Sequence, residues 1–130
     1  MDRQECVELL ATDTIGRLAV IDGGTPTILP VNYVLDGEDV IFRTDPGLKL
    51  DAGPRAPASF EIDAFDRSTR SGWSVVVSGR LEEVTLYDAH RWSRVHQLPV
   101  EPWAAGDKAH WMRLVGTKIA GRRIDSPPFR

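Results

Sequence analysis

The sequence predicts a mostly β domain in which about six short antiparallel strands close, or nearly close, into a small barrel. Segments rich in β-branched residues recur along the chain. Two of the breaks between them, Asp22-Gly23-Gly24 and Asp36-Gly37, are hairpin turn signals. Strands joined by tight turns pair antiparallel, because parallel pairs need long crossover connections. The 130 residues suffice for one domain, and closing its sheet into a barrel removes exposed strand edges.

A short helix is expected at the N-terminus. Asp2 can cap its first turn, and Glu5 three residues later completes a pair that resembles a capping box. The apolar residues that follow recur at helical spacing and define one face: Cys6, Val7, Leu10 and Ala11. The polar run 12–14 and Gly16 end the helix.

The strands are expected where apolar and β-branched residues run between turn signals. Five of them cover residues 15–22, 27–35, 39–44, 58–65 and 73–84, and a last, interrupted strand covers 111–115 and 118–124. A second amphipathic helix is expected over 86–98, one or two helical turns over 46–52, and a loop with Pro and Gly over 99–108. Residues 1–125 are expected to form a single domain, with 126–130 as a C-terminal tail.

Composition excludes several classes of protein. Hydrophobic residues make up 42% of the chain and charged residues 27%, which is typical of a globular domain. No apolar run reaches the ~18 residues of a membrane helix, and the polar N-terminus does not resemble a signal peptide. The single cysteine, Cys6, excludes an intrachain disulfide framework and fits a reducing compartment. A cytoplasmic protein without membrane contact is expected.

The charge pattern argues against a nucleic-acid partner. The net charge is −3 and the isoelectric point is about 5.6, and the sequence contains no cluster of five or six Lys and Arg residues. Residues 1–66 carry a net charge of −8 and residues 67–130 a net charge of +5. The simplest interpretation is that the unlike halves attract each other within the fold or across a dimer.

The common catalytic motifs are absent from the sequence. It contains no G-x-S-x-G elbow, no G-x-x-x-x-G-K-[ST] loop, no G-x-G-x-x-G and no H-E-x-x-H. The three histidines, His90, His96 and His110, lack the spacing of metal ligands. Neither a metal site nor a catalytic side chain is predicted.

Two neighbouring segments nevertheless indicate a binding site. Pro30 lies inside an otherwise good strand, where it cannot donate to a ladder. A gap in the barrel wall at this point would leave backbone groups of Val31, Asn32 and Tyr33 facing a ligand.

The second segment follows shortly downstream. Arg43 and Thr44 end the third expected strand, and Lys49 lies at the start of a short helical segment. A guanidinium, a hydroxyl, an ammonium and helix-start N–H groups can together hold a phosphate. The alternative is that Arg43 and Lys49 are solvated turn residues.

The run ILPVNYVLDGEDVIFRTDPGLKLDA, followed by SFEID and SGWSVVVSGRLEEV, resembles the pyridoxamine 5′-phosphate oxidase-like, FMN-binding split-barrel family. It is most similar to the small bacterial members. The likeness extends from the helix before Ile15 to the closing segment 121–124. It implies a six-stranded antiparallel split β-barrel with two short helices, which acts as a homodimer with a flavin at each end of the subunit interface.

The resemblance also implies site residues. The strand 28–33 would run along the isoalloxazine and ribityl chain, Arg43, Thr44 and Lys49 would hold the phosphate, and Ser74 would add a hydrogen bond to the cofactor. Trp73 can stack near the flavin or plug the barrel. Trp103 can cover the partner subunit's cofactor or pack on its own barrel.

The chain departs from the true oxidase at two places. It lacks the C-terminal Arg-Leu-His-Asp-Arg stretch, and its phosphate-binding pair is reduced to Leu48-Lys49. Pyridoxamine phosphate is therefore not the expected substrate. The sequence predicts an FMN-binding protein that oxidises or reduces a small organic substrate, with the cofactor supplying the chemistry. The alternatives are a deazaflavin- or haem-binding split barrel, the latter weakened by the lack of a well-placed axial histidine, and a non-catalytic sensing module.

Overall fold

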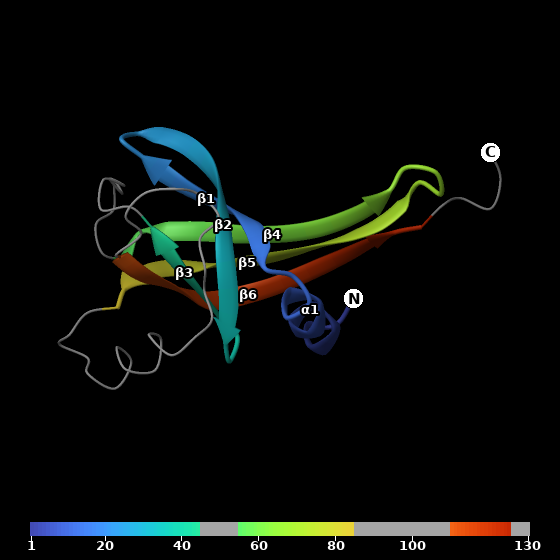
Figure 1. The fold of residues 1–130 in the computed structure, drawn as a ribbon, viewed down its shortest axis with the longest axis horizontal. Helices are drawn as coiled ribbons and strands as arrows, with labels where there is room; N and C mark the ends of the chain where they lie inside the picture. Colours follow the sequence, from blue (N-terminus) through green and yellow to red (C-terminus); the bar gives the residue numbers. More distant parts are fainter. Residues whose placement is uncertain (45–54, 85–109, 126–130) are drawn as a thin grey trace.

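The computed structural model describes residues 1–44, 55–84 and 110–125 (Figure 1). Its elements are α1 (Arg3–Leu10), β1 (Ile15–Asp22), β2 (Thr25–Asp36), β3 (Asp39–Thr44), β4 (Pro57–Asp66), β5 (Ser71–Glu83) and β6 (His110–Ile124). The six antiparallel strands form a closed barrel in the order β1-β2-β3-β6-β5-β4, which confirms the predicted fold class. The helices expected over 46–52 and 86–98 and the loop over 99–108 lie outside the described residues.

Both predicted hairpin turns are present. Gly23 and Gly24 connect β1 to β2 with φ of 58° and 82°, and Gly37 connects β2 to β3 with φ of 66°. These left-handed backbone conformations favour glycine, because it carries no Cβ. The turn chemistry therefore explains where these three strands begin and end.

The interruption predicted in the last strand is a β-bulge. β6 runs as one strand, but Ser78 of β5 pairs with Lys118 while Gly79 pairs with Gly116, so Thr117 is the extra residue. A Cβ on Gly79 would lie 1.9 Å from the Val115 carbonyl oxygen, which explains why this position has no side chain.

Helix α1 begins as predicted, but its buried face is narrower than the predicted apolar face. The Asp2 carboxylate accepts a hydrogen bond from the Glu5 amide (2.9 Å), whereas the Glu5 side chain accepts from Arg123 of β6 and does not close a capping box. On the expected apolar face Cys6 and Leu10 are buried and Val7 is half-buried, but Ala11 is exposed because the helix has already ended there. No helix within the described residues has the length and apolar character to cross a membrane.

The core fills the interior of the barrel. Alternate residues of the strands point inward, as strand geometry requires, and α1 contributes Cys6 and Leu10 at one end. The largest fully buried side chains on the strands are Leu18, Tyr33, Val40, Ile41, Phe42, Phe60, Ile62, Val75, Val77, Leu81 and Leu114. Among these, Ile41 belongs to a separate small cluster with Val84 and Trp111.

A buried ion pair ties the β2–β3 turn to the barrel. Arg113 of β6 is 5% exposed and donates to Asp36 and to Asp39, each at 2.7 Å. Burial lowers the pKa of Arg113, but its hydrogen bonds to the two carboxylates raise that pKa by more. The guanidinium therefore stays charged and anchors both ends of the turn.

The barrel is closed unevenly. β4 pairs with β5 along its whole length, and β5 pairs with β6 over residues 72–83. In contrast, β1 pairs with β4 over Arg17–Ala19 alone, and β2 pairs with β3 over residues 33–36 alone. The outer half of the β1–β2 hairpin therefore projects from the barrel, as Figure 1 shows. Among the described residues, no strand pairs with either edge of this outer half.

Candidate functional site

The first opening is a fork at which β2 and β3 separate. The last pair of their ladder is Tyr33 with Phe42. Beyond it β2 continues from Asn32 along β1, while Arg43 and Thr44 continue along β6. Asn32 and Arg43 are the next residues beyond that last pair on β2 and on β3. The two segments singled out in the sequence therefore lie on the two sides of this fork.

The backbone of β2 departs from the sequence-based expectation. The ladder with β1 is continuous from Thr25 to Asn32, and Pro30 lies in it opposite Arg17, so Pro30 makes no gap there. The Tyr33 amide donates to the Thr14 carbonyl (3.0 Å). Since backbone groups alternate between the edges of an antiparallel strand, those of Val31 point to β1 as well.

The expectation that Val31 and Tyr33 present backbone groups to a ligand is therefore wrong. By the same alternation, the backbone groups of Ile28, Pro30 and Asn32 point to the other edge of β2, the edge from which β3 departs. Pro30 lacks an N–H at this edge, so it costs the β1 ladder no hydrogen bond.

The side chains of β2 divide between core and surface. Val31 packs against the core, and Tyr33 is 2% exposed, with its hydroxyl donating to the Leu10 carbonyl. Burial raises the pKa of Tyr33, with a smaller contribution from the Asp13 charge. Pro30 is exposed, and Asn32 is half-buried with its amide 3.4 Å from the Thr14 carbonyl oxygen. A ligand at the fork would meet the outward-facing residues and not the Tyr33 ring.

The other side of the fork carries a cation on an aromatic ring. The Arg43 guanidinium lies 5.1 Å from the centre of the Trp111 ring, on the adjacent strand β6. Guanidinium groups commonly stack on aromatic rings in this way. Thr44 ends β3 opposite His110. Lys49 and Trp103, which the sequence also indicated, lie outside the described residues.

The remaining two predicted residues lie elsewhere on the barrel. Ser74 is half-buried and pairs with Asp63, near the start of β5. It is three strand spacings, about 14 Å, from Asn32 across β1 and β4. Trp73 packs against the core, which favours the alternative that it plugs the barrel. One chain therefore does not bring Ser74 to the fork.

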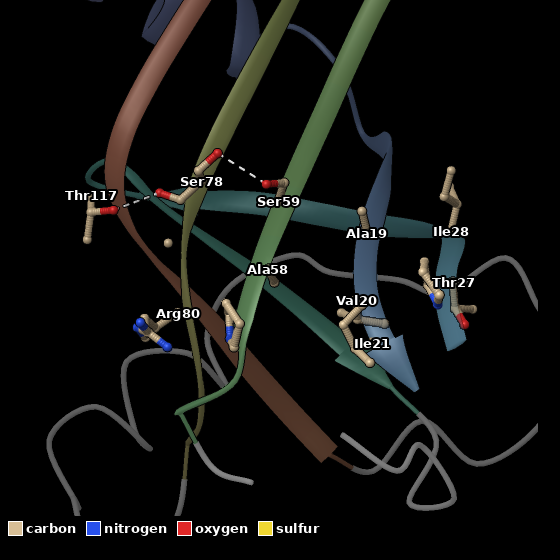
Figure 2. Close-up of a pocket in the computed structure, with 13 residues that line it drawn as sticks. Ala19, Val20, Ile21, Thr27, Ile28, Ala58, Ser59, Ser78, Arg80 and Thr117 are labelled. Carbon is tan, nitrogen blue, oxygen red and sulfur yellow. Dashed lines mark hydrogen bonds between the residues drawn. The ribbon is translucent and has the colours of Figure 1, made fainter. Parts of the chain in front are cut away.

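The second opening is a hollow of about 760 Å³ on the outer side of β1, β4 and β5, where β1 leaves β4 (Figure 2). One wall is apolar, and the other carries hydroxyl groups and a guanidinium. The lining residues are Ala19, Val20, Ile21, Pro26, Thr27, Ile28, Pro57, Ala58, Ser59, Ser78, Gly79, Arg80 and Thr117. Sequence reasoning missed the hollow, because polar residues at alternate strand positions are indistinguishable from ordinary solvent-facing ones.

A smaller recess of about 180 Å³ lies farther along the same outer face, beside Pro30, Arg17 and Asp63. Arg17 donates to Glu61 (2.9 Å) and to Asp63 (3.2 Å). Burial raises the pKa of Glu61, and the neighbouring Asp63 raises it further. Within the parts of the chain that the structure describes, no group of three or more His, Cys, Asp or Glu side chains is placed to hold a metal ion.

Comparison with known proteins identifies the family. The model of the pyridoxamine 5′-phosphate oxidase family matches residues 2–123. An uncharacterized protein of Mycobacterium tuberculosis is 35% identical over 109 residues, which cover 79% of this chain and 70% of that protein. The structure of an FAD-binding protein from Mycobacterium smegmatis is similar with a TM-score of 0.77 at 30% identity, covering 95% of this chain and 97% of the other.

A second solved structure agrees with the first. An FAD-binding protein from Mesorhizobium loti has a TM-score of 0.74 and 25% identity, and the match covers 96% of each chain. The fold, the family match and these relatives confirm the resemblance seen in the sequence. This chain belongs to the pyridoxamine 5′-phosphate oxidase family.

Proposed function

We propose that this protein binds a flavin nucleotide at the fork between β2 and β3. The ring would lie along the outward side of β2 at Pro30 and Asn32, and the phosphate would lie toward Arg43, Thr44 and Lys49. Family membership supports the proposal, as do the two similar structures described as FAD-binding proteins. The observation that carries it is the fork itself, where the two candidate segments adjoin at the end of one ladder.

The described residues of the fork fit such a ligand. Pro30 offers exposed apolar surface to a flat ring. Arg43 offers a charge-assisted donor, which is the group that recognises phosphate in proteins. Apolar surface combined with a few placed polar groups is typical of cofactor sites.

We also propose that the protein is an oxidoreductase for a small organic substrate. The bound flavin would supply the electron transfer, and the protein would supply position and electrostatics. In this scheme β2 holds one side of the ring, Arg43 neutralises the phosphate, and no side chain has to act as acid, base or nucleophile. FMN is the minimal ligand that meets these contacts, and FAD would use them with its adenylate extending beyond.

A homodimer with two cofactors would complete the site. Within one chain Ser74 lies on β5, three strands from β2 around the barrel, so a second copy would bring a Ser74 to the flavin. Phe65 and Ile124, each 54% exposed, lie in one row across β4, β5 and β6 and offer apolar surface for such a contact. Sedimentation should give a dimer binding two flavins, and a monomer that binds flavin tightly would contradict this part of the proposal.

The phosphate contact is tested by Lys49→Ala. Loss of a charge-assisted hydrogen bond worth ~1.5–3 kcal/mol should weaken FMN binding roughly tenfold to a hundredfold. Riboflavin, which has no phosphate, should bind as before. The matched control is Lys118→Ala, which removes an exposed lysine of β6. Fluorescence titration of the flavin-free parent protein and of both variants measures the affinities for FMN and for riboflavin. Equal losses of affinity for FMN and riboflavin in Lys49→Ala would show that Lys49 does not contact the phosphate.

The cofactor class is tested by the absorbance spectrum of the purified protein and by mass spectrometry of the released ligand. Flavin bands would support the proposal, and a Soret band or a released deazaflavin would contradict it. Titration with FAD beside FMN identifies the preferred nucleotide. Turnover with a reduced nicotinamide separates an enzyme from a non-catalytic flavin-binding protein.

A further inference from the structure

The hollow beside β1 has an apolar wall that belongs to the projecting hairpin. Ile28 pairs with Ala19 and Pro26 pairs with Ile21, so the outward positions of both strands form one apolar surface. Ile28 is 70% exposed and Ile21 is 38% exposed. Large apolar side chains that line a hollow in this way are typical of surfaces that a ligand covers.

The opposite wall is polar and comes from β4, β5 and β6. The hydroxyls of Ser59 and Ser78 lie 3.1 Å apart, and the Thr117 hydroxyl donates to the Ser78 carbonyl (3.2 Å), as Figure 2 shows. Arg80 lies two residues beyond Ser78 on the same side of β5 and is exposed. Its guanidinium is 3.4 Å from the Arg55 carbonyl oxygen and makes no ion pair with any described residue. The hollow therefore has a positive end.

The polar wall depends on irregular backbone. Thr117 is the bulge residue of β6, and the bulge turns its hydroxyl toward Ser78. Gly79 permits the close approach of the two strands at this point. Bulges often re-aim a side chain next to a functional site, so two features of the fold converge on the same wall.

We propose that this hollow binds a small organic anion, with its apolar ring against Ile21 and Ile28 and its carboxylate or phosphate at Arg80. A volume of about 760 Å³ lies within the ~300–1,000 Å³ range of small-molecule sites. The inference goes beyond flavin binding and does not depend on it, because the fork is on the β3 edge of the hairpin and the hollow on the β4 edge. Recognition rests on charge and on apolar contact, so an uncharged ligand of the same shape should bind less well.

The test is a titration of ¹⁵N-labelled, flavin-free protein followed by NMR. The probes are 2-naphthoate, 2-naphthyl phosphate and the uncharged 2-naphthamide. Saturable shifts at the amides of Ser59, Ser78 and Gly79 are expected for at least one anion, with about tenfold weaker binding of the amide. Comparison of the two anions distinguishes a carboxylate from a phosphate ligand.

Arg80→Gln should weaken binding of the preferred anion about tenfold and leave 2-naphthamide unchanged, while Arg80→Lys keeps the charge and should restore most of the affinity. The matched control is Arg67→Gln, in the exposed turn between β4 and β5 at the other end of β4. FMN affinity, measured separately, should be the same in Arg80→Gln as in the parent protein. Equal weakening by Arg67→Gln, competition between FMN and the anion, or a flat titration because a second copy covers the hollow would each overturn the proposal.

Discussion

The β4–β5–β6 side of the barrel and the β1–β2 hairpin differ in how they are held. β4 is paired with β5 from Pro57 to Asp66, and β5 with β6 over residues 72–83. Within the part of the chain that the structure describes, the hairpin pairs with β4 only over residues 17–19 and with β3 only over residues 33–36. The long ladders keep the barrel closed. The edges of the hairpin can therefore remain unpaired at the fork and at the hollow. Stability and ligand access are therefore located on different strands.

Burial separates the projecting half of the hairpin from the barrel wall. Phe60 and Val75 of the long ladders and Leu18 in the paired part of β1 are fully buried, whereas Ile21 and Ile28 of the projecting half remain exposed. Local stability in proteins varies with such packing, and binding elements are drawn from the less stable part. The difference can be tested by substitutions of similar chemistry on the two sides.

The largest effect is expected from Phe60→Ala. The Phe60 ring is fully buried, and its centre lies 4.6 Å from that of Tyr33 in an edge-to-face contact. Its removal leaves a cavity and should lower the free energy of unfolding by about 3–5 kcal/mol in urea titrations. Ile28→Ala on the hairpin should change the same quantity by less than ~0.5 kcal/mol. Similar losses for both variants would remove the distinction between the two sides.

Arg113→Met should cost about 3 kcal/mol, because it leaves the carboxylates of Asp36 and Asp39 without their buried partner. Asp39 keeps some solvent, which places the loss at the lower end of the usual range. Arg3→Ala breaks an exposed ion pair with Glu38 of the same turn and should leave the urea midpoint nearly unchanged. If the two variants were equally mild, Arg113 would not anchor the β2–β3 turn.

Much of the strand pattern could be predicted from the sequence. The turn glycines and the alternation of apolar residues define β1, β3, β4 and β5 to within two residues. The cap at Asp2 follows from its chemistry. These features are local, so a single sequence contains them.

The fork and the hollow could not be predicted to the same extent. From Ile28 to Leu35, β2 is apolar at every position except Asn32, so the sequence does not say that Tyr33 points inward and Pro30 outward. Which edge of β2 opens depends on where the barrel closes, and that is set by pairs distant in sequence, such as Arg17 with Glu61. The burial of Arg113 depends likewise on Asp36, 77 residues away. The hollow needs β1, β4 and β5 together, and no local pattern describes it.

Pro30→Val tests whether proline keeps the edge of the fork open. Its position in the β1 ladder uses no N–H, so the fold should stay intact and the free energy of unfolding should change by less than ~1 kcal/mol. The new N–H would point to the β3 edge of β2, where it would extend pairing or crowd the ring. Flavin binding should therefore weaken. If Pro30 only protects an edge from aggregation, flavin affinity will be unchanged and solubility will fall.

The smallest expected effect concerns Glu61, which lies in the short ladder that joins the hairpin to β4. Burial raises the pKa of Glu61, and Asp63 adds to the increase, whereas Arg3 lowers the pKa of the exposed Glu38. A raised pKa in the folded state means that the stability contributed by Glu61 is complete below its unfolded pKa and is lost as the pH rises through its folded value. The stability contributed by Glu38 depends on pH in the opposite direction, and it is lost as the pH falls.

Carboxyl ¹³C titration by NMR should therefore give Glu61 a higher pKa than Glu38. Asp63→Asn removes the neighbouring negative charge and should lower the pKa of Glu61, whereas Asp66→Asn, at the far end of β4, should leave it unchanged. In the parent protein, we compare amide hydrogen exchange at the β1–β4 ladder with that at the β5–β6 ladder as a function of pH. The ratio of the β1–β4 rate to the β5–β6 rate should be lower below the folded pKa of Glu61 than above it. A pKa of Glu61 that does not respond to Asp63→Asn would mean that burial alone sets it, and the attachment of the hairpin would then be independent of this acid pair.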